Sequence, residues 1–112
     1  MAALHPLVSF YAGDEFQIAG SLFDQDGTPI GLTGAAIEWK LATLDRSVVL
    51  DYSIGGGIAV TDAANGLILI TVSEGDSAKL SPGRYRDQLR VTTSTGVLST
   101  QWVGFIDVKQ PL

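Results

Sequence analysis

The sequence has no cysteine and a single histidine, His5. Without cysteine the chain can form no disulfide bond and no thiolate metal site, and its redox compartment is not indicated. Nucleophilic catalysis needs a histidine or cysteine to supply or activate the attacking group. His5 stands beside Pro6 in what should be a solvated terminal segment. We therefore expect no catalytic triad, no histidine metal site and no enzyme.

Basic residues are scarce as well. Seven Lys and Arg stand against twelve Asp and Glu, which gives a formal net charge of −5. A nucleic-acid partner is not expected, because its phosphates would need a basic surface. Long apolar runs are also missing, so no segment should span a membrane, and residues 1–13 lack the positive charge that opens a secretory signal. The sequence predicts a soluble protein with no membrane partner.

What the sequence does contain is a repeated alternation of apolar and polar residues, interrupted by Gly, Asp, Asn and Pro. A period of two is typical of strands with one buried face. The expected strands cover residues 15–23, 36–42, 47–54, 57–62, 66–72, 84–92 and 97–108. Only residues 73–80 could form a helical turn. A chain of 112 residues favours one domain over 1–112, with residues 1–9 as an arm that is mobile or exchanged between subunits.

The most specific local motif is "LSPGRY", Leu80 to Tyr85. It matches a tyrosine corner, where the chain crosses between the sheets of a sandwich and the tyrosine hydroxyl bonds to upstream backbone. Asp76 is expected to help fix the corner. Trp39 stands where the third strand of such a sandwich carries its core tryptophan. Together these motifs predict an all-β fold: an immunoglobulin-like antiparallel β-sandwich of about seven to eight strands with a tyrosine corner.

One carboxylate conflicts with this pattern. Counting in steps of two from Tyr85 places Asp87 on the inward face, where a disulfide-bearing domain would have its second cysteine. A buried carboxylate without partners costs several kcal/mol in effective terms. Asp87 therefore either accepts a hydrogen bond from the indole N–H of Trp39 or Trp102, or lies on a bulge that turns it outward.

Residues 22–34, "LFDQDGTPIGLTG", begin with the D-x-D-G array of a calcium loop. Asp24, Asp26 and Thr28 would fill the first ligand positions, but the later positions that need oxygen ligands are apolar. A turn explains the segment better, because Asp26-Gly27 supplies a residue that tolerates positive φ. We expect no metal, no cofactor and no small-molecule substrate.

Two strands carry apolar residues on both faces, at 67–72 and 101–108. Each sheet of a small sandwich has one dry face, so the surplus indicates burial against another protein. The expected docking surface consists of Ile68, Ile70, Val103 and Phe105, with Arg84, Arg86 and Arg90 as a polar rim. The three arginines share one strand face, which is either a solvated face opposite Glu38 and Lys40 or a docking face for an acidic partner or a second subunit.

Residues 10–109 contain a series of turn and corner motifs, and the order of these motifs resembles the order found in a known family. They are Gly13-Asp14, Asp24 to Gly34, Asn65-Gly66, Asp76 to Tyr85, and Gly104 to Val108. In this arrangement the chain is similar to small immunoglobulin-like domains of tailed-bacteriophage virions, which include the amino-terminal domains of baseplate upper proteins and short tail-associated proteins. Gly31 and Gln88 depart from the family pattern, which prefers aspartate at both positions.

The resemblance implies a non-enzymatic structural protein of the virion, assembled in the bacterial host cytoplasm and without cofactor or metal. The expected role is protein–protein docking in the tail or baseplate, with other virion proteins as partners and with repeated copies or a homo-oligomer. The alternatives are a capsid decoration protein and a carbohydrate-binding or adhesion module for host contact. The last would need exposed aromatic residues, for which Tyr11 and Tyr52 are the candidates.

Overall fold

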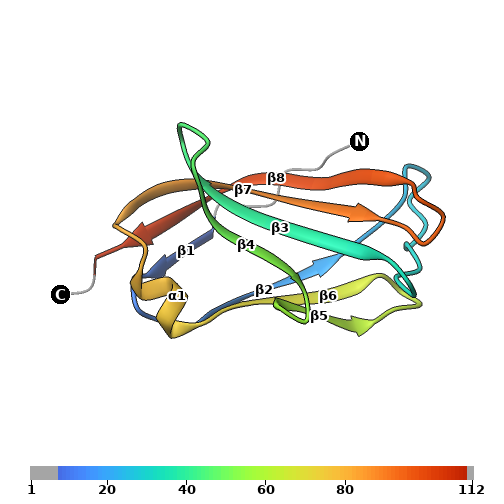
Figure 1. Cartoon of the computed structure of the whole chain (residues 1–112), viewed down its shortest axis with the longest axis horizontal. Helices are drawn as coiled ribbons and strands as arrows, with labels where there is room; N and C mark the ends of the chain where they lie inside the picture. Colours follow the sequence, from blue (N-terminus) through green and yellow to red (C-terminus); the bar gives the residue numbers. More distant parts are fainter. Residues whose placement is uncertain (1–7, 111–112) are drawn as a thin grey trace.

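The computed structural model describes residues 8–110 (Figure 1). Its elements are β1 (Val8–Tyr11), β2 (Phe16–Ser21), β3 (Ala36–Thr43), β4 (Val48–Ile54), β5 (Gly57–Asp62), β6 (Leu67–Val72), α1 (Glu74–Ala78), β7 (Gly83–Thr92) and β8 (Leu98–Lys109). Strands β2 to β8 lie on the segments that the alternation predicts, and α1 lies within the expected helical turn. Among the described residues, no helix has the length and apolar character needed to cross a bilayer.

The strands form two layers packed face to face. Their hydrogen-bonded order is β1-β8-β7-β3-β4-β5-β6-β2. Between β4 and β5 the pairing is limited to Ser53 with Gly57 and Ile54 with Ile58, so the order divides there into a larger sheet and a smaller one (Figure 1). The larger sheet is β1-β8-β7-β3-β4 and the smaller sheet is β5-β6-β2. The expected immunoglobulin-like sandwich is confirmed.

Two strand pairs are parallel, although the sequence favours an antiparallel sandwich. One is the short β4–β5 contact and the other joins β1 to the final residues of β8. Of the expected arm at 1–9, Val8 and Ser9 pair with Ile106 and Asp107 of the same chain, while residues 1–7 lie outside the described residues. His5 therefore also lies outside them.

The tyrosine corner forms as the motif predicts. The Tyr85 hydroxyl donates a hydrogen bond of 2.7 Å to the backbone oxygen of Ser81, and Leu80 is buried beneath the bend. Asp76 has a different role from the one expected: it accepts a hydrogen bond of 2.5 Å from the hydroxyl of Tyr52. Asp76 belongs to α1, and Tyr52 belongs to β4, which is an edge strand of the larger sheet. The hydrogen bond therefore attaches this edge strand to the helix.

Tyr52 is expected to make the stability of the fold depend on alkaline pH. Burial, followed by the hydrogen bond to Asp76, raises the pKa of the Tyr52 phenol well above its ordinary value of 10.0. The folded chain thus holds this proton more tightly than the unfolded chain does. The contribution of this group to the free energy of unfolding should therefore be fully present and constant below pH 10.0, and it should be lost as the pH rises above that value.

The measurement is urea unfolding of the wild type and of Tyr52→Phe between neutral and alkaline pH. The variant should lose about 1 kcal/mol at neutral pH with the hydrogen bond. The free energy of unfolding of the variant should also fall less steeply at alkaline pH than that of the wild type. Tyr11→Phe, at an exposed tyrosine, is the matched control and should keep the wild-type pH profile. An unchanged alkaline decline in Tyr52→Phe would contradict the assignment.

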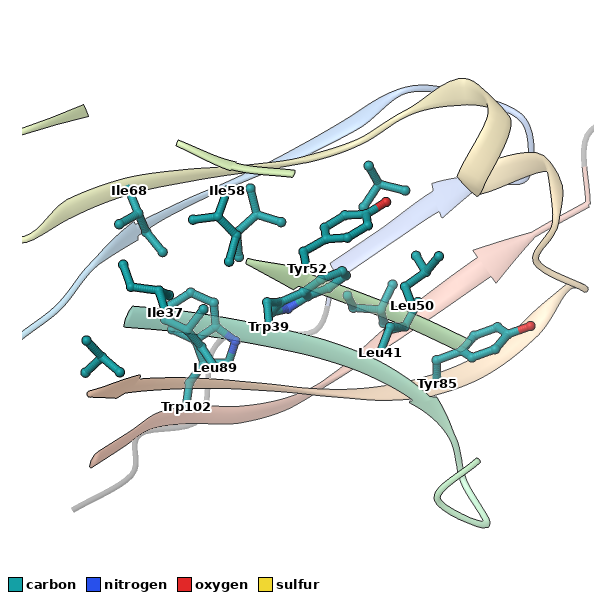
Figure 2. Packing of buried hydrophobic residues seen from close by; sticks show 14 of the residues in the cluster. Ile37, Trp39, Leu41, Leu50, Tyr52, Ile58, Ile68, Tyr85, Leu89 and Trp102 are labelled. Atoms are coloured by element: carbon teal, nitrogen blue, oxygen red, sulfur yellow. The ribbon is translucent and has the colours of Figure 1, made fainter. Parts of the chain in front are cut away.

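Asp87 is buried and joins both tryptophans. Its side chain is 2 % exposed, and its Oδ2 accepts hydrogen bonds of 2.9 Å from the indole Nε1 of Trp39 and of 2.9 Å from that of Trp102. Figure 2 shows the two indoles among the apolar side chains between the sheets. The sequence left two possibilities for Asp87, and the inward one is correct. Both indoles, rather than one of them, are its partners.

The indole of Trp102 also reaches the opposite sheet, at Gly20 of β2. A Cβ at Gly20 would lie 3.0 Å from the Cη2 and Cζ3 atoms of Trp102 and 3.1 Å from Cγ1 of Ile68. Any larger residue would have to displace these groups, which explains glycine in the middle of a strand. Trp102 thus hydrogen-bonds within its own sheet and packs against the backbone of the other sheet.

Candidate docking surfaces

Part of the expected docking surface lies in the core, which corrects the prediction. Ile68 and Ile70 are buried among the apolar residues between the sheets, and Figure 2 shows Ile68 near Ile58. In register, Ile70 of β6 faces Ile18 of β2 and Ile58 of β5, so β6 is an inner strand with its isoleucine face inward. Alternation shows that a strand has two faces but not which of them is buried when both are apolar.

The remaining residues of the predicted surface share the solvent side of the larger sheet, here called the outer face and defined by Val103, Phe105, Arg84, Arg86 and Arg90. Phe105 is 43 % exposed, and Val103 is partly buried. In the β7–β8 ladder, Phe105 stands opposite Arg86 and Val103 stands opposite Gln88. The outer face therefore combines an exposed aromatic ring with neighbouring cations.

Arg84 is held in place by Asp107 of β8. Its Nε and one terminal nitrogen donate to the two carboxylate oxygens at 2.8 and 3.2 Å, and its guanidinium lies 5.7 Å from the ring centroid of Phe105. The hydrogen bond raises the pKa of Arg84 and lowers that of Asp107. Arg84 is exposed and Asp107 is partly exposed, so this pair orients the guanidinium over Phe105 and contributes little to stability.

Arg90 and Arg86 differ in their surroundings. Arg90 stands opposite Glu38 on β3, and its Nε is buried without a hydrogen bond in the described part of the chain. Glu38 itself contacts Lys40 at 3.6 Å. Within residues 8–110 no carboxylate lies within ion-pair distance of Arg86. The Arg86 guanidinium can therefore pair with a carboxylate of another protein.

A shallow hollow of about 320 Å³ lies beside Arg86 on the outer face. Its lining includes Lys40, Ala42, Arg46, Val48, Arg86 and Val103. Three cations thus border an apolar floor. Asp87 also borders the hollow, but its Oδ2 accepts the two indole hydrogen bonds on the core side. The hollow is therefore bordered by three cations, although the whole chain carries a net charge of −5.

A second surface, which the sequence analysis missed, lies at the end of the sandwich where the β2–β3 loop meets the β7–β8 turn (Figure 1). A groove of about 680 Å³, here called the loop-end groove, lies there. It is lined by Phe23, Asp24, Gln25, Pro29, Ile30, Gly31, Thr93, Val97, Leu98, Ser99, Thr100 and Gln101. Phe23, Val97 and Leu98 are exposed large apolar residues.

The loop that forms one wall of this groove is shaped by Asp24. Its Oδ1 accepts hydrogen bonds from the backbone N–H of Asp26 at 2.9 Å and of Thr28 at 3.0 Å, and Gly27 adopts a φ of 82°. The segment is therefore the turn that the sequence favours. A hydrogen bond of 3.1 Å from the backbone N–H of Phe23 to Oε1 of Gln101 attaches the loop to β8.

In the sequence, two pairs of adjacent apolar residues indicate this groove. Leu22-Phe23 and Val97-Leu98 each follow or begin a strand. Because successive strand residues point to opposite sides, adjacent apolar residues cannot both enter the core. Leu22 is buried and Phe23 is exposed, as this rule requires. Among the described residues, no cluster of three His, Cys, Asp or Glu side chains could hold a metal ion.

Comparison with known proteins finds similarity in structure. No family model matches the chain, and no curated protein matches it in sequence. The N-terminal domain of ORF48 of phage TP901-1 superposes with a TM-score of 0.64 at 18% identity, covering 93% of this chain and 85% of that one. CopC from Methylosinus trichosporium OB3b gives a TM-score of 0.53 at 13% identity, covering 95% of this chain and 86% of that one. The resemblance to an immunoglobulin-like phage domain is thus confirmed at the level of the fold.

Proposed function

We propose that the protein is a non-enzymatic structural component of a tailed-phage virion that acts by docking on other virion proteins. The observation that carries this proposal is the outer face, where Phe105 is exposed beside Arg84 and Arg86. An aromatic residue with arginines around it is the side-chain combination that is enriched at protein–protein contacts. Packing it against a partner would remove apolar area from water at roughly 25 cal/mol per Å².

The phage assignment has two supports. The fold is similar to that of a domain of a phage TP901-1 protein over 93% of this chain. The turn and corner motifs of the sequence also resemble those of virion domains. A tail or baseplate location is the finer part of the proposal and follows from that resemblance.

The carbohydrate-binding alternative has little support in the structure. It needs exposed aromatic residues, but Tyr52 is buried and bonded to Asp76. Tyr11 is exposed, and the ammonium group of Lys109 lies 5.9 Å from the centroid of its ring. A single aromatic ring covered by a cation is a poor platform for a sugar. Docking on protein accounts better for the surfaces that the fold presents.

The test is to fractionate phage particles from cells that carry the gene into tails and heads, and to quantify the chain in each fraction with an antibody. We expect the chain to co-purify with tails. Recovery with heads would instead support capsid decoration. Absence from both fractions would contradict the proposal. Binding on a glycan array in that case would favour the adhesion alternative.

Variants connect the test to the outer face. Phe105→Asp should reduce incorporation into particles about tenfold or more, since losing about 1.4 kcal/mol of docking energy has that effect. Ile54→Asp is the matched control, because Ile54 is also 43 % exposed and lies away from Phe105 on β4. Equal incorporation of the two variants would show that the outer face is not the docking surface.

A further inference from the structure

We infer that the loop-end groove receives Phe105 of a second copy of this chain. This inference deepens the proposed docking role and rests on it. The contact joins two different surfaces, so each copy carries both an inserting surface and a receiving surface. Four features of the two surfaces carry the inference: shape, apolar character, charge and separation.

The inserting surface is the exposed ring of Phe105. It projects from the outer face between Arg84, whose guanidinium lies 5.7 Å from its centroid, and Arg86, its neighbour across the β7–β8 ladder. Arg84 is already paired with Asp107. Arg86 has no ion-pair partner within residues 8–110. A partner that accepts Phe105 should therefore offer an apolar cavity with a carboxylate at its edge.

The loop-end groove meets both requirements. Its volume of about 680 Å³ is ample for one aromatic side chain, and Phe23, Val97 and Leu98 expose apolar surface around it. Asp24 is the charged residue among its lining residues, and no lysine or arginine lines it in the described part of the chain. The Asp24 carboxylate uses Oδ1 for the turn and is exposed. It is available to Arg86 of the entering copy.

The two surfaces cannot satisfy each other within one molecule. Gln101 is the groove-lining residue of β8 that is nearest to Phe105 in sequence, and it lies four positions away. At about 3.3 Å per residue the strand separates the two by roughly 13 Å, which is more than a phenylalanine side chain can span. The partner must therefore be another molecule. A second copy of this chain meets the requirement, because it carries both the matching apolar surface and the matching charge. A reciprocal pair of contacts would give a closed dimer, and a repeated contact would give a ring or a stack.

The experiment measures the mass of the purified full-length chain by sedimentation, from low micromolar to near-millimolar concentration. We expect the average mass to rise above that of the 11.8 kDa monomer as concentration increases. The association should weaken as salt is added, because the Arg86–Asp24 attraction is screened. A wild-type chain that stays monomeric throughout this range would overturn the inference.

Two variants then test the geometry by mixing. Phe105→Asp removes the inserting ring but leaves the groove, whereas Leu98→Asp damages the groove but leaves the ring. Each variant alone should be monomeric, while an equimolar mixture should form a one-to-one complex and nothing larger. Ile54→Asp should associate like the wild type. Circular dichroism of each variant verifies that it is folded.

The outcomes separate this inference from the proposed function. If either single variant associates like the wild type, or if the mixture stays monomeric, the contact is wrong. Incorporation into tails by a chain that is monomeric in solution would leave the proposed function intact and overturn only the self-contact. Self-association of a chain that is absent from particles would support the self-contact and contradict the proposed function.

Discussion

Replacing Asp87 with alanine is expected to lower the free energy of unfolding by about 2 to 6 kcal/mol, because two buried indole N–H groups lose their acceptor at about 1 to 3 kcal/mol each. Both hydrogen bonds, from Trp39 and from Trp102, end on the same oxygen of Asp87. A small cavity would remain beside the rings and add to the loss. Since domains have a total stability of about 5 to 15 kcal/mol, this change should leave the fold marginal.

Urea unfolding followed by tryptophan fluorescence is the measurement, since the two reporters are the residues that lose their partner. Asp87→Asn is the matched control, because its amide oxygen occupies a similar position and can still accept from the indoles. It should retain much of the stability that the alanine variant loses. An alanine variant as stable as the wild type would show that the indoles are satisfied without the carboxylate.

The second large effect is expected from Ile70→Asp. Ile70 is fully buried, with Ile18 and Ile58 as its cross-strand neighbours. An aspartate there would have to remain charged in an apolar core or take up a proton, and either choice costs several kcal/mol in addition to the lost burial. The change should exceed about 4 kcal/mol, which is exceptional for a single substitution.

Phe105→Asp is the matched comparison for this prediction. The same substitution at a residue that is 43 % exposed should alter stability by less than about 1 kcal/mol. Thermal unfolding by circular dichroism distinguishes the two variants directly. If Ile70→Asp folds as well as Phe105→Asp, the burial of the isoleucine face of β6 is wrong, and the docking surface expected from the sequence regains its support.

The parts of the fold that could be predicted depend on local chemistry. Alternation located strands β2 to β8 because one face of each strand is buried, and "LSPGRY" located the corner because its turn and its tyrosine hydrogen bond lie within a few residues of each other. The turn at Asp24 to Gly27 was predictable for the same reason. Its hydrogen bonds involve only neighbouring residues.

The parts that could not be predicted depend on which strands become neighbours. Residues 67–72 are apolar on both faces, so only the pairing of β6 with β2 and β5 decides that Ile68 and Ile70 point inward. The loop-end groove requires two turns distant in sequence to meet at one end of the sandwich. Tyr52 meets Asp76 only because the helix lies against the edge of β4. None of these contacts can be predicted from the residues of one strand alone.

The cluster of Asp87, Trp102 and Gly20 has a consequence for how the chain reaches its native state. Immunoglobulin domains that bridge their sheets with a disulfide depend on an oxidant, and disulfide formation takes seconds to hours. Here the corresponding region is held by two indole hydrogen bonds and by a ring seated on a glycine. These contacts form and break at the speed of ordinary side-chain packing. Refolding from urea should therefore be equally complete in reducing and in oxidising buffer.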